Sequence, residues 1–350
     1  MKKRLAFLFV LLLVNAGCVS QPDTGKEVST TEAATTTTEL TTTTATTAST
    51  IADTTTKPTT TTTTPPAKTR TMPEKQDWVM EDGVRIADGI SPSVVKLSDG
   101  RYRMYATVNS IGSYVSSDGL EYAPEKSSVL NAGGIARVVR LSNGIYRMTY
   151  STVEGKSMGF QSEKRVYFKS ATSKDGTVFE PENVMRFQSK GGTAYTSLST
   201  PDIFEFQGGL LRMYYTGDMF GTDFGREGFI RSASSPDGGV TWKRDDNVRI
   251  MHEAMNPDVV KTPDGRYYIY YAARPEDRDS RAMDIYAAVS DDGLKYKDLG
   301  IVLSSGRDDI RYNDPIVVEA LEGYRMYYSE TTIESGEEKT AIKSALLKTD

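Results

Sequence analysis

The stretch Asn256-Pro-Asp-Val-Val-Lys-Thr-Pro-Asp-Gly-Arg-Tyr-Tyr-Ile-Tyr-Tyr-Ala272 decides the fold of this 350-residue chain. Its β-branched pair, Val259 and Val260, favours a strand, and Asp264-Gly265 supplies the positive φ that a tight hairpin needs. The aromatic run that follows is typical of a returning strand. The stretch is therefore predicted to form one β-hairpin.

The same pattern occurs five times along the chain, as repeat architectures require. The other four copies begin at Ser91, Ile135, Thr200 and Asp314. Four of the five hairpins are followed by a second one, built around Ser-x-Asp-Gly and an aromatic residue. These second hairpins begin at Ser116, Ser173, Ser235 and Ser290. Four strands per unit predict the blades of a β-propeller, and the Asp of each such turn is expected to bond its own backbone.

The fifth repeat lacks a fourth strand, because the sequence stops at Asp350, just after a third strand expected at residues 340–347. Residues 78–86 match residues 242–250, the expected outer strand of the third unit, almost position for position. An N-terminal strand that completes the last blade would leave no free sheet edge. We therefore expect an all-β, five-bladed propeller of four-stranded antiparallel blades over residues 77–350, closed by this strand.

The first 76 residues predict export and anchoring. Residues 1–17 have the basic start and short apolar run of a secretory signal peptide. Cys18, the only cysteine, stands where a lipoprotein signal places its lipidated residue, so residues 18–28 are expected to form a lipid-anchored N-terminus. The alternative is an ordinary cleaved signal with an incidental cysteine.

The Thr-rich residues 29–76 cannot bury a core and are expected to be a disordered linker. With the lipid anchor, they predict an extracellular protein held on the cell surface, with the membrane as a partner.

Composition also limits the partners and cofactors. The net charge is −5 and no cluster of Lys or Arg stands out, so nucleic acid is not an expected partner. One His and one Cys are too few for a His/Cys metal site, and no cofactor is expected.

The repeated x-Pro-x-Val-Val…Asp-Gly-x-Tyr-x-Met-Tyr-Tyr pattern resembles the five-bladed propeller glycoside hydrolases of the arabinanase, xylosidase and invertase type. The resemblance covers about residues 77–350, and the turn at Ser235 is similar to the Asp-box of sialidases. It implies a glycan bound in a central funnel, with catalytic carboxylates at the starts of the innermost strands. Glycosidic hydrolysis needs one carboxylic acid and one carboxylate at the scissile bond.

Five carboxylates are the candidates for this catalytic set: Asp88, Asp202, Glu253, Asp258 and Asp314. The related enzymes typically place an Asp before the Pro of the first blade and a Glu near the Pro of a later blade. Here the corresponding residues are Ser91, Thr200 and Asn256.

Roles can be assigned to the five as hypotheses. Asp88 or Asp314 is the expected base, Glu253 the expected acid, and Asp202 or Asp258 the group that raises the pKa of that acid. For Asp202 and Asp258 an equally good interpretation is structural, with each accepting backbone N–H bonds where the chain enters the strand.

Three further residues are candidates for substrate binding: Arg137, His252 and Asn256. Arg137 is expected either to bind an acidic group on a sugar or to pair with Asp202 or Asp258. His252 is the only histidine, and a lone His more often packs or faces solvent. The sequence thus predicts a glycosidase-like propeller, with a non-catalytic glycan- or protein-binding propeller as the alternative.

Overall fold

The structure is a computed structural model that describes residues 71–349, apart from 131–134, 155–156, 159–160, 163–164, 189–198, 218–228, 248, 251–253 and 279–281. The predicted signal peptide, Cys18 and nearly all of the predicted linker lie outside the described residues, as do His252 and Glu253. Within the described residues the only helix is the short 3-10 turn η1 (Gln207–Gly209), and none is long and apolar enough to cross a membrane.

The first three blades are four-stranded sheets in which neighbouring strands are antiparallel. Blade 1 contains β2 (Ile90–Lys96), β3 (Tyr102–Thr107), β4 (Ile111–Ser116) and β5 (Ala123–Lys126). Blade 2 contains β6 (Ala136–Arg140), β7 (Tyr146–Glu154), β10 (Arg165–Ser173) and β11 (Glu180–Gln188), with a small extension of β8 (Ser157–Met158) and β9 (Gln161–Ser162). Blade 3 contains β12 (Ser199–Glu205), β13 (Leu211–Gly217), β14 (Phe229–Ser235) and β15 (Lys243–Arg244).

The last two blades complete the set. Blade 4 contains β16 (Met255–Lys261), β17 (Tyr267–Ala273), β18 (Asp284–Ser290) and β19 (Lys297–Leu303). Blade 5 contains β20 (Ile310–Ala320), β21 (Gly323–Glu334), β22 (Glu337–Lys348) and, outermost, β1 (Val79–Ala87). The prediction of five four-stranded antiparallel blades is confirmed.

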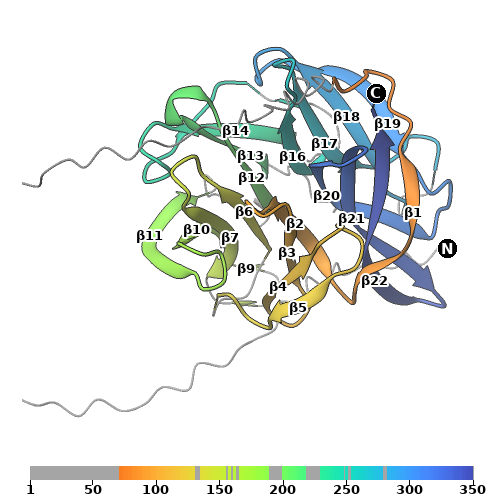
Figure 1. Cartoon of the computed structure of the whole chain (residues 1–350), viewed down its shortest axis with the longest axis horizontal. Helices are drawn as coiled ribbons and strands as arrows, with labels where there is room; N and C mark the ends of the chain where they lie inside the picture. Colours follow the sequence, from red (N-terminus) through yellow and green to blue (C-terminus); the bar gives the residue numbers. More distant parts are fainter. Residues whose placement is uncertain are drawn as a thin grey trace, which may run out of the picture. The chain divides into compact units, whose positions relative to one another are not determined.

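The ring closes as the sequence predicted. Strand β1 pairs antiparallel with β22, with Val79 opposite Leu346 and Ile86 opposite Ile342, and Figure 1 shows this orange strand beside the dark blue one. The inner strands contact one another in the order β2, β6, β12, β16, β20 and back to β2. The N-terminal strand therefore completes the last blade.

The repeated aromatic and Met positions form the packing between blades. Met104, Met148, Met213 and Met326 are fully buried, and so are the tyrosine pairs at 214–215, 270–271 and 327–328. Burial of this kind supplies most of the stability of such a ring. The tyrosines are therefore packing residues, and sugar stacking by them is not available in this structure.

The Asp of each Ser-x-Asp-Gly turn bonds its own backbone, as predicted. In the first turn, Asp118 Oδ1 accepts hydrogen bonds from the amides of Leu120 (2.8 Å) and Glu121 (3.1 Å) and from Ser116 Oγ (2.8 Å). These donors lower the pKa of Asp118 to about 2. The turns at Asp175, Asp237 and Asp292 have the same arrangement.

Three of the four turns, at Asp118, Asp175 and Asp292, also accept hydrogen bonds from the preceding blade in the ring. Arg325 of blade 5 donates to Asp118 O (2.7 Å), and Tyr327 Oη donates to Gly119 O (2.8 Å). Tyr105 bonds Gly176 O in the same way (2.7 Å). The repeated Arg and Tyr positions thus join neighbouring blades through the turn backbone.

Blade 5 has no Ser-x-Asp-Gly turn to which blade 4 could bond. The segment just before β1 takes the place of that turn. Tyr268 Oη donates to Met72 O (2.6 Å), Tyr270 Oη donates to Gln76 Oε1 (3.0 Å), and Met72 is fully buried. Residues 71–76 are the end of the predicted linker, and Met72 is the one large apolar side chain among them. The structure packs them against blade 4, so the folded unit begins before residue 77.

Candidate functional site

The five inner strands all begin at one end of the ring, which we call the entry end: the starts of β2, β6, β12, β16 and β20. In four of these strands the pairing register shifts at the Pro of the repeat. Strand β6 has Ala136 in place of Pro and no shift. Such β-bulges turn side chains out of their regular direction and are common beside active sites.

The residue before the Pro adopts the same unusual backbone in three blades. Ser91, Asn256 and Asp314 have φ of +53°, +57° and +52°, the left-handed region that non-glycine residues rarely occupy, and all three are buried. Strain of this kind persists where the surrounding structure holds it, and it gathers at functional sites. The pre-proline positions are therefore candidates for contact with a ligand.

In blades 1, 3 and 4 the residue after the Pro bonds to the next blade. Its side-chain oxygen accepts a hydrogen bond from the backbone N–H of the next inner strand. The pairs are Ser93 Oγ with Val138 N, Asp202 Oδ2 with Val259 N and Asp258 Oδ2 with Val317 N, all at 2.9 Å. The backbone-bonding interpretation of Asp202 and Asp258 describes these contacts, and the donors come from the neighbouring blade.

In blade 2 the equivalent position holds Arg137. Its side chain donates hydrogen bonds, whereas the side chains at this position in blades 1, 3 and 4 accept them. Its guanidinium donates to the carbonyl of Pro92 in blade 1 and to that of Pro315 in blade 5 (3.1 Å), and its side chain is buried. Blades 2 and 5 are not neighbours in the ring. Arg137 therefore reaches across the axis and joins three blades at the entry end.

Asp202 and Asp258 form an acidic pair whose charges interact with each other and with that of Arg137. Burial raises the pKa of Asp202 to about 6, against the opposing influence of the Arg137 charge. Burial, and then the charge of Asp202, raise the pKa of Asp258 well above its usual value, again opposed by Arg137. Both carboxyl groups thus have raised pKa values, because the single positive charge of Arg137 only partly offsets their burial.

Asp314 has a different environment. Its Oδ2 accepts hydrogen bonds from Ser91 Oγ and Ser329 Oγ, both at 3.0 Å. Its Oδ1 is buried and has no hydrogen-bond partner among the described residues. Buried carboxylate oxygens are nearly always paired, so this unpaired oxygen needs a donor that the described residues do not supply.

The remaining predicted residues lie in different places. Asp88 is exposed at the end of the outermost strand β1, in a shallow hollow with Glu330, Lys339 and Lys343, and the structure does not bring it into the buried axial group. Asn256 donates its backbone N–H to Thr216 Oγ1 (3.0 Å). The sequence analysis missed Ser93 and Ser329, although Ser93 could have been found because it occupies the same repeat position as Asp202 and Asp258.

No cation site is evident in the part of the chain that the structure describes. No three His, Cys, Asp or Glu side chains converge there as metal ligands would.

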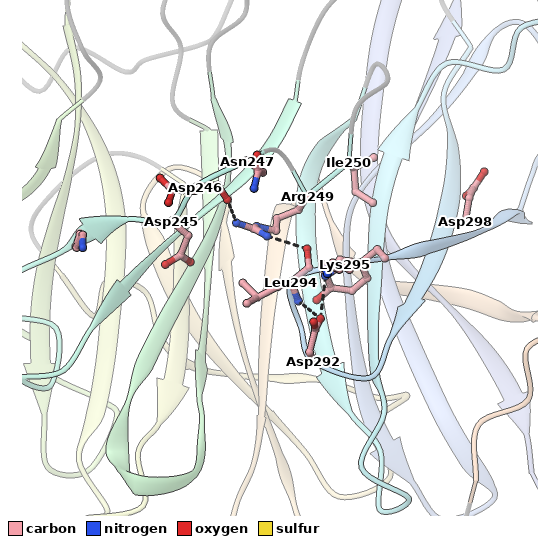
Figure 2. A pocket seen from close by; sticks show the side chains of 11 residues that line it. Asp245, Asp246, Asn247, Arg249, Ile250, Asp292, Leu294, Lys295 and Asp298 are labelled. Atoms are coloured by element: carbon pink, nitrogen blue, oxygen red, sulfur yellow. Dashed lines mark hydrogen bonds between the residues drawn. The ribbon is translucent and has the colours of Figure 1, made fainter.

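One hollow in the described surface lies away from the entry end. It has a volume of about 760 Å³ and is lined mainly by the outer part of blade 3 and the second turn of blade 4. Figure 2 shows Arg249 at its centre, donating to Leu294 O (2.8 Å) and to Asp246 O. Arg85 donates to Leu120 O and Asp82 O in the same manner between blades 5 and 1. The hollow is therefore a repeated junction between blades, and the candidate site is the axial group at the entry end.

Solved structures support this fold. No protein-family profile and no curated protein matches the chain significantly. Similar structures include a thermostable family-43 glycoside hydrolase (20% identity, 78% of this chain and 96% of that one, TM-score 0.59). An endo-arabinase from Bacteroides thetaiotaomicron is similar as well (16%, 76% and 99%, TM-score 0.51).

An N-acetylgalactosamine deacetylase from F. plautii, solved with blood group B trisaccharide, has the same degree of likeness (16%, 79% and 94%, TM-score 0.56). At these identities the likeness shows the five-bladed propeller fold, which matches the expected arabinanase and xylosidase type. The named neighbours carry out two different reactions on sugars, so the reaction of this chain has to be argued from its own residues.

Proposed function

We propose that this chain is a carbohydrate-active protein that hydrolyses a glycosidic bond at the entry end of its propeller. The observation that carries the proposal is the buried pair of Asp202 and Asp258 beside Arg137. Burial raises the pKa of both carboxyl groups, and a raised pKa is what a general acid in glycoside hydrolysis needs. The sugar-processing neighbours of the same fold support the substrate class.

Asp202 is the proton donor in this proposal. A pKa of about 6 matches a group that must be protonated before the step and ionised after it. As the proton leaves, negative charge develops on the pair, and Arg137 stabilises that charge from a fixed position. Glu253, the acid predicted from the sequence, lies outside the described residues and stays a prediction.

The test is release of reducing sugar from a panel of polysaccharides by the purified full-length protein. Asp202→Asn is expected to lower the rate by about 10² to 10⁴, the usual contribution of a general acid. Asp237→Asn, in the third Ser-x-Asp-Gly turn, is the matched control and should retain the wild-type rate. No release by the wild-type protein would refute hydrolysis, and equal rates in all three proteins would refute the site.

One observation favours a second function, non-catalytic glycan binding. Ser91, Thr200 and Asn256 stand where the related enzymes carry carboxylates. A propeller that has kept its scaffold and lost its acids would bind a glycan without cleaving it. Calorimetric binding of an oligosaccharide that stays intact after prolonged incubation would identify this function, and turnover of the same sugar would exclude it.

We also propose that the protein is exported and held on the cell surface by a lipid on Cys18. The basic and apolar start of the chain and its single cysteine support this location. Cys18→Ser is expected to abolish incorporation of labelled fatty acid and to release the protein into the medium. Equal labelling of both proteins would contradict the anchor.

A further inference from the structure

We propose that Asp314 of blade 5 is the general base of the reaction, and that it has replaced the carboxylate that related enzymes carry before the Pro of blade 1. The inference rests on the proposed hydrolytic function. It chooses between Asp88 and Asp314, the two residues that the sequence offers as the base, and it explains how the role moved to blade 5.

The first argument is position. Blades 1 and 5 are neighbours, and the inner strands β2 and β20 are in contact. Ser91 occupies the first-blade position, and its Oγ lies 3.0 Å from Asp314 Oδ2. The blade 5 carboxylate is therefore within one hydrogen bond of the side chain that stands in for the missing aspartate.

The second argument is the backbone. Ser91 and Asp314 precede the Pro of their strands, and the register shifts there in both strands. Their φ angles are +53° and +52°. Because the two positions have the same conformation, a carboxylate can be carried by either one without a change of fold.

The third argument is the state of the carboxyl group. Two hydroxyls, Ser91 Oγ and Ser329 Oγ, donate to Oδ2 and so fix the rotation of the group. Oδ1 has no partner among the described residues, although Asp314 is only 6% exposed. A carboxylate held in place, with one buried oxygen left unpaired, suits a general base, because that oxygen can accept a proton from a water molecule that binds beside it.

The step balances with water as the only co-reactant. Asp314 Oδ1 takes a proton from a water molecule, and the water oxygen forms a bond to the anomeric carbon. The bond from that carbon to the glycosidic oxygen breaks, and the leaving oxygen takes the proton of Asp202. One product gains OH and the other gains H, so no oxidant or reductant is needed.

The experiment moves the carboxylate back to blade 1. Rates of reducing-sugar release are compared for full-length wild type, Asp314→Ser and the double variant Ser91→Asp with Asp314→Ser, on a polysaccharide that the wild type degrades. Asp314→Ser is expected to lose about 10² or more in kcat, and the double variant to recover at least about tenfold of that loss. The fall in rate on the acidic side, which a general base imposes on a pH profile, should disappear in the single variant and return in the double one.

The outcomes are distinguishable. No release by the wild type overturns the proposed function itself. Release by the wild type, with Asp314→Ser within about threefold of it, overturns the role of Asp314 and leaves the proposed function standing. A folded double variant that stays as inactive as the single one also overturns it.

A milder variant covers the case in which Asp314→Ser does not fold, as judged by circular dichroism. Ser329→Ala keeps the carboxylate and removes one of the two donors that orient it. We expect a fall of about tenfold in kcat with little change in KM, because the interaction acts on the reacting group. A folded Ser329→Ala protein with wild-type kcat would contradict the inference.

Discussion

The aspartates of the Ser-x-Asp-Gly turns are exposed, whereas the axial aspartates, Asp202 and Asp258, are buried. Asp118 and Asp175 are exposed, accept several donors from their own turns, and have pKa values lowered to about 2. Asp202 and Asp258 are buried, accept one backbone N–H each from the next blade, and have raised pKa values. Hydration and the number of donors decide whether a carboxylate braces a turn or retains a proton.

The two sets affect stability with opposite signs. A group whose folded pKa is lowered stabilises the fold above its ordinary pKa of 3.8, and this contribution is lost as the pH falls through the folded value. A group whose folded pKa is raised contributes fully below 3.8, and this is lost as the pH rises through the folded value, about 6 for Asp202. Replacing the arginine beside the axial pair, one axial aspartate or one turn aspartate should therefore change stability in different ways.

The largest effect is expected from Arg137→Met, which leaves the axial carboxyl groups without their cation. The free energy of unfolding at pH 7 should fall by about 3–5 kcal/mol, as when one partner of a buried ion pair is removed. The loss should shrink as the pH falls to 4, because protonated carboxyl groups no longer need the arginine. Urea denaturation at both pH values measures this, and Arg137→Lys is the control for charge. A loss below about 1 kcal/mol at pH 7 would show that the arginine is not paired across the axis.

A smaller effect of opposite sign is expected from Asp202→Asn. The amide oxygen can still accept the N–H of Val259, and one buried charge is gone. Between pH 4 and 7 the wild type should lose stability relative to this variant, by about 2–3 kcal/mol for a shift from 3.8 to about 6. Thermal melting across this range measures the difference in slope. Parallel curves for the two proteins would mean that the pKa of Asp202 is not raised in the folded protein.

The smallest effect is expected from Asp118→Ala in the first turn. Loss of its bonds to the turn amides should cost about 1 kcal/mol at pH 7. The difference from wild type should diminish as the pH falls toward 2, where the native carboxyl group also becomes protonated. Chemical denaturation at pH 7 and pH 3 tests this, with the exposed Asp291 changed to Ala as control. An equal difference at both pH values would mean that the pKa of Asp118 is not lowered in the folded protein.

The sequence predicted the blades, the turns and the closing strand because their determinants are local or repeated. A Ser-x-Asp-Gly turn contains its own donors and acceptors, so Asp118 could be interpreted without knowing the rest of the molecule. The match between residues 78–86 and 242–250 extends to one side-chain contact. Arg85 Nε bonds Ser344 Oγ and Arg249 Nε bonds Ser232 Oγ at equivalent places.

The axial network could not be predicted in the same way. Asp202 meets the N–H of a residue in the next repeat, and Arg137 bonds carbonyl groups that every residue possesses. The repeat position singles out these side chains, but it does not say which N–H or carbonyl group of another blade each one meets. Asp88 looked like an axial residue because it lies two residues before β2, but the chain at that point is still leaving the outer strand β1. Met72 is a single apolar side chain, too weak a signal to move the start of the folded unit.

The closing strand has a consequence for the order in which the molecule is assembled. Val79 and Leu346 are partners, so the first strand to be synthesised has to wait for the last one. Contacts that are so far apart in sequence slow folding, because the whole intervening chain must be ordered or looped out before they form. Until then β1 is an unpaired edge, and the charged residues Glu81, Asp82 and Arg85 along it are the kind that discourage pairing with other chains. The completed ring should therefore resist proteases only after the C-terminal strand has docked.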